Sequence, residues 1–325
     1  MAQQIVNAPV SLSFEPSLIV VGETRIAAQN EYNGISLLKG ILIILVIIGH
    51  ILPGGVYGNN WSYWIYSFHM PLFLALVGYL LNEKFIETAD RKEIWAKYFK
   101  KMIIPWMIAW TTYVCLEWYF YDNFTTPLDV IEFFFLPRMH LWFVAAMFAY
   151  VYVLVGLKKI HKSNLSILLV SIIVSIFVVL YFEYWHSWTE WDTTFLGDVY
   201  KTYKPHYFVF FMLGYCLKPY KLNRMWGWLG KIALAGVIYW RFVDMSGPKA
   251  FYTLDWYLLN ILLIILVLPY VKSDLFNQKR ILQYPLGIQR TSKFVRYCCY
   301  PLMWLGKNSL YIYLWHAIFK YFLFL

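Results

Sequence analysis

The sequence predicts an all-α fold, a polytopic transmembrane helix bundle of about nine to ten spans with its N-terminus in the cytoplasm. Its composition, its apolar runs of bilayer length and its alternating basic loops all favour this fold. Of the 325 residues, 61% are hydrophobic and only 14% are charged. A soluble chain of this length has too little interior for so much apolar surface. Since no polar linker divides the runs, we expect one membrane domain at 31–325, after a weakly ordered cytoplasmic tail at 1–30.

Apolar runs long enough to span a bilayer recur along the chain. Several carry Trp and Tyr at their ends, as the interfacial belts of membrane proteins do. Two further stretches, 84–101 and 276–304, mix apolar and basic residues and predict helices on the inner membrane surface. A tenth, re-entrant span at 276–304 stays an alternative. The predicted spans are 35–52, 62–82, 102–121, 140–157, 164–183, 205–217, 225–243, 251–271 and 305–325.

Basic residues are concentrated in every second loop, at 83–101, 158–163, 218–224 and 272–296. Cytoplasmic loops keep the excess of Lys and Arg, so the N-terminus is predicted inside and, with nine spans, the C-terminus outside. The alternate loops are poorer in basic residues, which are Arg138, Lys201, Lys204, Arg241 and Lys249. The net charge of +10 therefore reflects topology and predicts no nucleic-acid partner. We expect a multi-pass protein of the inner or plasma membrane, in contact with lipid.

The first predicted span carries two ionisable side chains on one face. In the run ISLLKGILIILVIIGH (35–50), Lys39 lies near the inner end and His50 near the outer end. A step of eleven residues is about three turns, so both side chains point the same way, roughly 16 Å apart along the axis. Ionisable groups at membrane depth are costly and usually mark a functional site. His69 and His316 are also predicted in the outer halves of their spans, as expected if a cytoplasmic donor delivers a group to an outer acceptor.

Each of these side chains also has a purely structural explanation. His50 is equally consistent with an interfacial histidine at a helix end, and Lys39 with a cation whose side chain extends to the interface. His69 lies two residues before a proline, where it would satisfy a backbone group that the proline frees. His140 and His206 are predicted to be interfacial hydrogen-bonding residues rather than catalysts. No HExxH or similar spacing is present, so we expect no metal site.

The basic residue separated from a histidine by ten residues resembles the first span of the integral-membrane acyltransferase-3 family. This family comprises O-acyltransferases of bacterial surface glycans, and the resemblance is to its fucose 4-O-acetylase-like branch. Four more segments resemble later spans in the family's order, and together the five extend from about residue 31 to the end. These four segments are YSFHMPLFLALVGYLL (66–81), HLWFVAAMF (140–148), FFMLGYCLK (210–218) and LGKNSLYIYLWHAIF (305–319).

The resemblance gives two residues of the first span a role. His50 matches the histidine that is considered catalytic in the family, and Lys39 matches a basic position that is more often Arg. Lysine lacks the bidentate fork of arginine. The chain also has Ser36 where many members carry Asp, and Val77 where the family usually has Ser. These departures concern the donor side of the site more than the chemistry at His50.

The resemblance implies an enzyme that moves an acyl group, in the first place acetyl, from cytoplasmic acyl-CoA to a hydroxyl of a cell-surface or lipid-linked glycan. His50 would act as general base on that hydroxyl. Lys39 and the loop cations would attract the phosphates of CoA. His69 or His316 would orient His50 or stabilise the oxyanion. A covalent acyl-histidine intermediate stays open, and the sequence names neither the acceptor nor the oligomeric state.

The alternative function is a transporter or flippase for a polysaccharide or lipid-linked glycan, and a non-catalytic scaffold is a third. Many spans and intramembrane polar groups fit a transporter as well as an enzyme. However, the sequence shows no pair of inverted halves, which many transporters have. A transporter also gives no reason for Lys39 and His50 to share a helix face. Dependence on acyl-CoA separates these functions.

Overall fold

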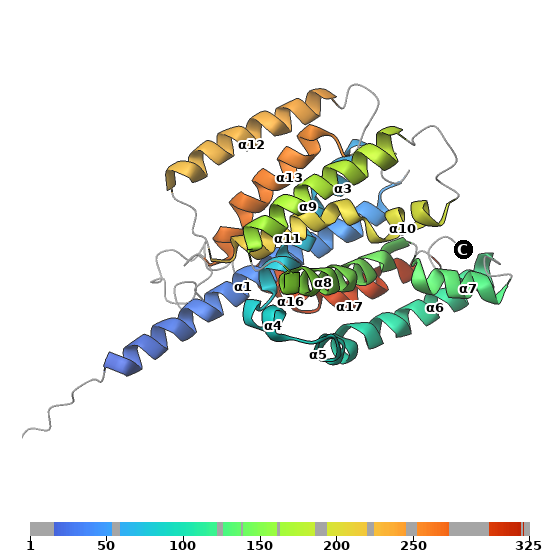
Figure 1. Cartoon of the computed structure of the whole chain (residues 1–325), viewed down its shortest axis with the longest axis horizontal. Coiled ribbons are helices and arrows are strands. Elements are labelled where there is room, and N and C mark those ends of the chain that lie inside the picture. The colour runs from blue at the N-terminus through green and yellow to red at the C-terminus, as the bar shows by residue number, and fades with distance from the viewer. Residues whose placement is uncertain are drawn as a thin grey trace, which may run out of the picture.

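The protein is an all-helical bundle in a computed structural model, which confirms the predicted fold class (Figure 1). Every regular element is a helix in the described part of the chain, which comprises residues 16–53, 59–121, 126–137, 139–160, 163–185, 194–219, 224–244, 252–272, 299–319 and 321. The first helix, α1 (Pro16–Ile51), begins outside the bundle and enters it with its C-terminal half. The proposed division at residues 30 and 31 stays a prediction.

Helices occupy all nine predicted spans. Within the described residues, four segments are each long and apolar enough to cross a membrane: Asn33–Ile51, Asn60–Leu80, Trp142–Ile160 and Asn164–Glu183. Leu254–Val267 and Ser309–Phe319 are shorter apolar helices. The elements of the bundle are α1, α3 (Asn60–Leu80), α6 (Ile104–Tyr121), α8 (Trp142–Ile160), α9 (Asn164–Val179), α11 (Phe208–Leu217), α12 (Arg224–Asp244), α13 (Leu254–Val267), α16 (Tyr300–Lys307) and α17 (Ser309–Trp315).

Short helices connect these elements at both ends of the bundle. They are α4 (Glu83–Thr88), α5 (Arg91–Tyr98), the π-helical turn η1 (Phe99–Ile103), α7 (Pro127–Phe135), the 3₁₀ turn η2 (Met139–Leu141), the π-helical turn η3 (Leu180–Trp185), α10 (Phe195–Tyr203), and the 3₁₀ turns η5 (Pro205–Tyr207), η6 (Leu268–Lys272) and η10 (His316–Phe319). The surface helix predicted at 276–304 falls mostly outside the described residues, which resume at 299. The same is true of most of the Trp-rich stretch at 185–192.

Two of the predicted helices are broken by a local cap. The stretch 84–101 is not one helix, because Asp90 caps α5: its side chain accepts from the Glu93 N–H at 2.7 Å while Glu93 accepts from the Asp90 N–H at 2.9 Å. Such reciprocal bonds start a new helix. The last predicted span divides at Asn308, whose side chain donates to the Trp304 carbonyl at 2.9 Å.

Glycines set two close helix crossings. A Cβ added at Gly40 of α1 would collide with the backbone of α16, and one at Gly306 of α16 would collide with the backbone of α1. Gly78 and Gly214 hold α3 and α11 together in the same way. Small residues allow this approach in membranes, where close packing replaces the hydrophobic driving force. The first crossing fixes α1, which carries Lys39 and His50, against α16.

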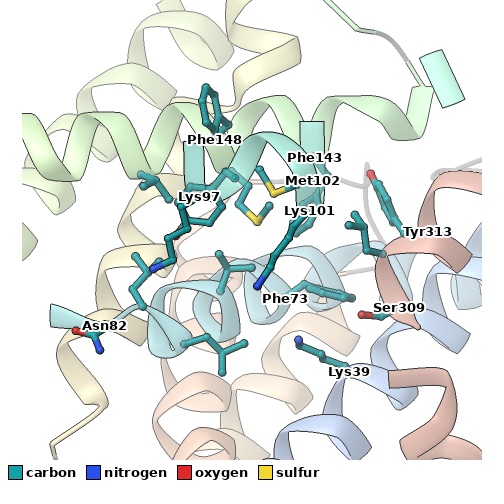
Figure 2. Close-up of a pocket in the computed structure, with 17 residues that line it drawn as sticks. Lys39, Phe73, Asn82, Lys97, Lys101, Met102, Phe143, Phe148, Ser309 and Tyr313 are labelled. Atoms are coloured by element: carbon teal, nitrogen blue, oxygen red, sulfur yellow. The ribbon is translucent and has the colours of Figure 1, made fainter. Parts of the chain in front are cut away.

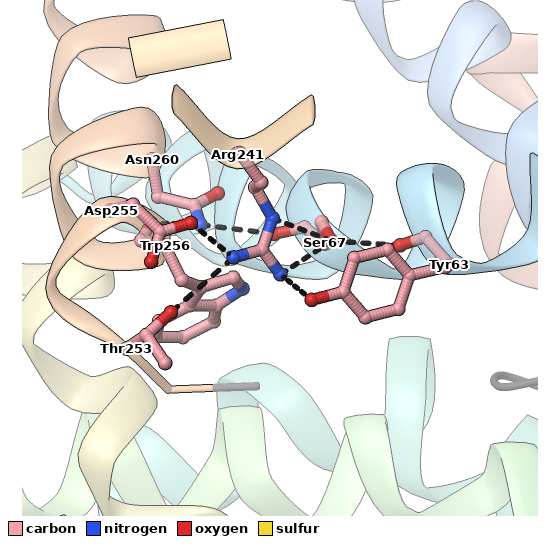
Figure 3. A network of polar contacts seen from close by, with 7 residues as sticks. All are labelled: Tyr63, Ser67, Arg241, Thr253, Asp255, Trp256 and Asn260. Carbon is pink, nitrogen blue, oxygen red and sulfur yellow. Dashed lines mark hydrogen bonds and ion pairs between the residues drawn. The ribbon is translucent and has the colours of Figure 1, made fainter. Parts of the chain in front are cut away.

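A buried polar network joins α3, α12 and α13 (Figure 3). The Arg241 guanidinium pairs with Asp255 at 2.6 Å and donates to the Tyr63 hydroxyl at 2.8 Å and the Ser67 hydroxyl at 3.0 Å. Asn260 donates to the Ser67 carbonyl at 2.9 Å. The loop charge pattern grouped Arg241 with the outer loops, but its side chain is fully buried. Burial is possible because the ion pair and hydrogen bonds replace water around the guanidinium.

Candidate functional site

Three histidines from three distant parts of the chain meet at one end of the bundle. His50 ends α1, His140 lies in η2 before α8, and His316 follows α17. The ring centroid of His316 lies 4.9 Å from that of His50 and 4.9 Å from that of His140, and the His50 and His140 centroids are 6.4 Å apart. We call these three residues the histidine cluster.

Backbone carbonyls determine where two of these rings carry a proton. His316 Nδ1 lies 2.7 Å from the Tyr313 carbonyl, and His140 Nε2 lies 3.2 Å from the Leu314 carbonyl. A carbonyl only accepts, so each of these nitrogens must donate. In the neutral ring the other nitrogen then carries a lone pair. For His316 that nitrogen is Nε2, which is buried and has no hydrogen-bond partner within the described residues.

His50 is the exposed member of the histidine cluster and contacts a tyrosine of α3. The Tyr66 hydroxyl lies 3.4 Å from His50 Nδ1. If Nδ1 donates to the Tyr66 oxygen, the unprotonated nitrogen of His50 is Nε2; if Tyr66 donates to Nδ1, Nε2 carries the proton. Tyr66 therefore influences which nitrogen of His50 is basic, and the exposure of His50 leaves the ring open to an incoming hydroxyl.

His69 supports Tyr66 from inside the bundle. Its ring centroid lies 5.2 Å from that of Tyr66, and its Nδ1 donates to the Ile65 carbonyl at 2.5 Å. The alternative explanation for His69 was that it bonds a backbone carbonyl freed by Pro71. Proline has no N–H, so the carbonyl four residues before it loses its helical partner. That carbonyl belongs to Ser67 and accepts from Asn260 instead. His69 therefore bonds the backbone one turn before it, and its ring lies beside that of Tyr66.

Tyrosines hold the cluster in place. The Tyr313 hydroxyl donates to the His140 carbonyl, and the Tyr113 hydroxyl donates to the Leu314 carbonyl at 3.1 Å. The Leu314 carbonyl is also the acceptor for His140 Nε2. Buried tyrosine hydroxyls need such partners. Because these bonds join η2, α6 and α17, the positions of His140 and His316 depend on each other.

A cavity of about 580 Å³ lies beside the cluster and contains three lysines (Figure 2). Lys39 of α1 and Lys101 of η1 point toward each other, and Lys97 of α5 lies farther along the cavity. Burial lowers the pKa of Lys97, and the positive charge of Lys101 lowers it further. The residues that line this cavity include three cations and no carboxylate, so its electrostatic potential favours an anion. We call this space the lysine cavity.

Tyr313 connects the lysine cavity to the histidine cluster. Its side chain lines the cavity, and its ring centroid lies 5.9 Å from the centroids of both His140 and His316. Lys39 lines the same cavity as Tyr313, and His50 packs against His316. A molecule held by its anionic part at the lysines would have its other end next to the histidines.

The site contains side chains that the sequence analysis did not select. His140 was predicted as an interfacial hydrogen-bonding residue, and the structure buries it within the histidine cluster. One sequence feature did point to His140: it is predicted at the outer end of its span, as His50 is of the first span. Lys97 and Lys101 were treated only as part of a loop charge, and Tyr66 was not singled out. His206 is buried among the rings of Tyr200, Tyr207 and Tyr252.

Among the described residues, no group of three or more His, Cys, Asp or Glu side chains has the arrangement to hold a metal ion. The cluster's nitrogens are instead committed in part to the backbone carbonyls of Tyr313 and Leu314. An imidazole that donates from one nitrogen to a carbonyl can accept a proton at the other, so the cluster has the groups for acid–base chemistry.

Residues 32–325 match the acyltransferase-3 family, described as an acyltransferase domain, and the chain belongs to this family. The match confirms the predicted family and enzyme class and favours an acyltransferase over the transporter. Two curated relatives carry the name nodulation protein NolL. That of Sinorhizobium fredii is 35% identical over 96 residues, 27% of this chain and 26% of the relative. That of Mesorhizobium japonicum is 32% identical over 100 residues, 29% and 26% of the two chains. The chain thus aligns with about a quarter of the length of these relatives. No solved structure matches it significantly.

Proposed function

We propose that this member of the acyltransferase-3 family transfers an acyl group, in the first place acetyl, from cytoplasmic acyl-CoA to a hydroxyl of a cell-surface or lipid-linked glycan. The observation that carries the proposal is that the lysine cavity and the histidine cluster are neighbours, with Tyr313 lining the cavity and its ring next to His140 and His316. The inner or plasma membrane is the expected location, with the lysines on the cytoplasmic side.

The lysine cavity fits the chemistry of the donor. Coenzyme A carries phosphates at one end and a thioester at the other, so it needs cations and an apolar channel. Lys39, Lys97 and Lys101 supply the cations, and most of the other lining residues are apolar or aromatic. Lysine binds phosphate as a point charge without fixed geometry. Phosphates held there would place the acyl end toward Tyr313 and the histidines.

His50 is the proposed general base. The acceptor hydroxyl oxygen attacks the thioester carbonyl carbon while its proton passes to the unprotonated ring nitrogen of His50. The carbon–sulfur bond then breaks, and the CoA sulfur leaves with the electron pair and takes a proton from the imidazolium. His140 and His316 hold the His50 ring from one side. Tyr66 holds it at Nδ1, and His69 supports Tyr66.

The exposed position of His50 supports an acceptor that arrives from the end of the bundle away from Lys39. A glycan hydroxyl is the proposed acceptor because the first-span pattern and the four later segments resemble acyltransferases of surface glycans. A covalent acyl-histidine would change the order of events but not the groups that take part. In that case CoA would be released before the acceptor binds.

The test is acyl-CoA turnover by the purified protein in lipid, followed as release of free thiol. His50→Ala is expected to lower kcat at least ~100-fold, the range of general-base catalysis. Lys39→Ala is expected to raise KM for acyl-CoA with a smaller change in kcat. His206→Ala and Lys231→Ala are the matched controls, since neither residue lines the lysine cavity or belongs to the histidine cluster.

Each result has a defined meaning. Turnover that survives His50→Ala would refute the role of His50. An equal rise in KM for Lys39→Ala and Lys231→Ala would refute specific binding of phosphates at Lys39. If wild-type protein neither binds acyl-CoA nor releases CoA with membrane glycan extracts, the proposed donor is wrong.

A further inference from the structure

Three aromatic rings close the part of the lysine cavity that faces the histidine cluster. They are Phe73 of α3, Phe143 of α8 and Tyr313 of α17, with exposed fractions of 7%, 5% and 4%. The ring centroids of Phe73 and Phe143 are 5.4 Å apart, and those of Phe143 and Tyr313 are 5.3 Å apart. Figure 2 shows Phe143 and Tyr313 at the end of the cavity opposite Asn82 and Lys97. We call these three residues the aromatic wall.

The aromatic wall is held in place by its neighbours. The Tyr313 hydroxyl donates to the His140 carbonyl, so the ring is fixed at both its backbone and its hydroxyl end. Phe143 lies one helical turn after His140, and its ring is packed between those of Phe73 and Tyr313. Buried rings packed on both faces move aside only if their neighbours move as well. The wall therefore has a defined shape rather than a flexible surface.

We propose that the aromatic wall selects the length of the transferred acyl group, admitting acetyl and excluding longer chains. This inference rests on the proposed acyl-CoA donor. A thioester that reaches the histidines must pass Tyr313, so its acyl chain is directed at the rings. Each added methylene must displace packed aromatic atoms, and overpacking of a filled site is unfavourable. A single methylene in an apolar pocket commonly changes specificity by about 10–200-fold.

The same α8 helix offers a matched control. Phe148 also lines the lysine cavity, but its ring contacts Trp95 and Tyr98 on the side of α5. Figure 2 shows Phe148 away from Tyr313. Replacing Phe143 or Phe148 by alanine removes the same ring from the same helix and cavity. Only the first replacement opens the aromatic wall.

The experiment measures binding of coenzyme A, acetyl-CoA, butyryl-CoA and hexanoyl-CoA to the full chain in lipid nanodiscs. No acceptor is needed for this measurement. Wild type is expected to bind acetyl-CoA at least ~100-fold more tightly than hexanoyl-CoA, following the effect of added methylenes. Phe143→Ala is expected to reduce this ratio to less than ~10-fold, and Phe148→Ala to leave it unchanged. Phe143→Leu, a smaller change, is expected to shift the ratio in the same direction if Phe143→Ala does not fold.

The outcomes separate this inference from the proposed function. If coenzyme A itself does not bind, the proposed donor fails and the inference fails with it. If coenzyme A binds but wild type takes acetyl-CoA and hexanoyl-CoA equally well, only the aromatic wall is refuted. The wall is also refuted if Phe148→Ala relaxes the ratio as much as Phe143→Ala does.

Discussion

Removal of the Asp255 carboxylate should destabilise the bundle more than removal of the whole ion pair. In Asp255→Ala the fully buried Arg241 guanidinium loses its ion-pair partner, which lies at 2.6 Å. It keeps its hydrogen bonds to the hydroxyls of Tyr63 and Ser67 and the longer one to Thr253. Breaking a buried pair from one side typically costs about 3–5 kcal/mol, because an uncompensated charge remains inside. Replacing both partners by apolar residues of similar size is often neutral or stabilising by about 1–4 kcal/mol. We therefore expect Arg241→Met with Asp255→Leu to recover most of the lost stability.

The assay is equilibrium unfolding of the protein in mixed micelles by titration with sodium dodecyl sulfate, followed by tryptophan fluorescence. Wild type, Asp255→Ala and the double variant are compared for the free energy of unfolding. A loss below about 1 kcal/mol in Asp255→Ala would show that water reaches Arg241, against its burial. A double variant as unstable as the single one would show that the network's hydrogen bonds, not its charge, hold α12 to α3 and α13.

Two further predictions compare matched pairs. Gly214→Ala places a methyl group against the α3 backbone and should cost about 1–3 kcal/mol in the same unfolding assay. Gly156→Ala, with nothing within 4 Å of the added Cβ, should be neutral or slightly stabilising; equal losses would refute the close crossing. His140→Gln removes the ring packed on His316 and should lower kcat by about 100-fold, as misplacement of a catalytic group does, with KM for acyl-CoA unchanged. His206→Gln should leave kcat unchanged, and a parallel loss in both would indicate a structural role only.

The location of the spans and the shared face of Lys39 and His50 could be predicted from the sequence. Both follow from short-range rules, namely the length of apolar runs and the 3.6-residue turn. The structure places Lys39 in the lysine cavity and His50 in the histidine cluster, as their spacing predicts. The helix break at Asp90 was also predictable, since Asp90 and Glu93 form a capping box whose spacing is visible in the sequence.

The partners of His50 could not be predicted in the same way. His140 and His316 are far from it in sequence, and no periodic pattern specifies which spans are neighbours. Helix neighbours in a membrane depend on close backbone contacts and on side-chain packing. The role of Arg241 was missed for a related reason. The charge of a loop predicts its side of the membrane. A single arginine can instead be buried when it pairs with a carboxylate from elsewhere in the chain, as Arg241 pairs with Asp255.

The contact between the first and last helices nevertheless corresponds to a spacing that is visible in the sequence. Gly306 of α16 contacts the backbone of α1 at Gly40, and His316 contacts His50. Each glycine precedes its histidine by ten residues. Equal spacings can bring both pairs together only if α1 and the α16–α17 segment run parallel and in register, over about 15 Å at 1.5 Å per residue. A single-residue insertion between Gly306 and His316 would rotate His316 by about 100° away from His50.

Parallel first and last spans also bear on the predicted side of the C-terminus. Val271, near the last described residue before 273–298, contacts Gly34 of α1, and Leu302, just after that stretch, contacts Gly40. Both contacts lie on the N-terminal side of His50, toward the lysine end of α1. The chain therefore leaves the described part and returns to it on the same side of the bundle. Within the described residues, α1 and the α16–α17 segment thus run in the same direction, as the predicted outer position of the C-terminus requires.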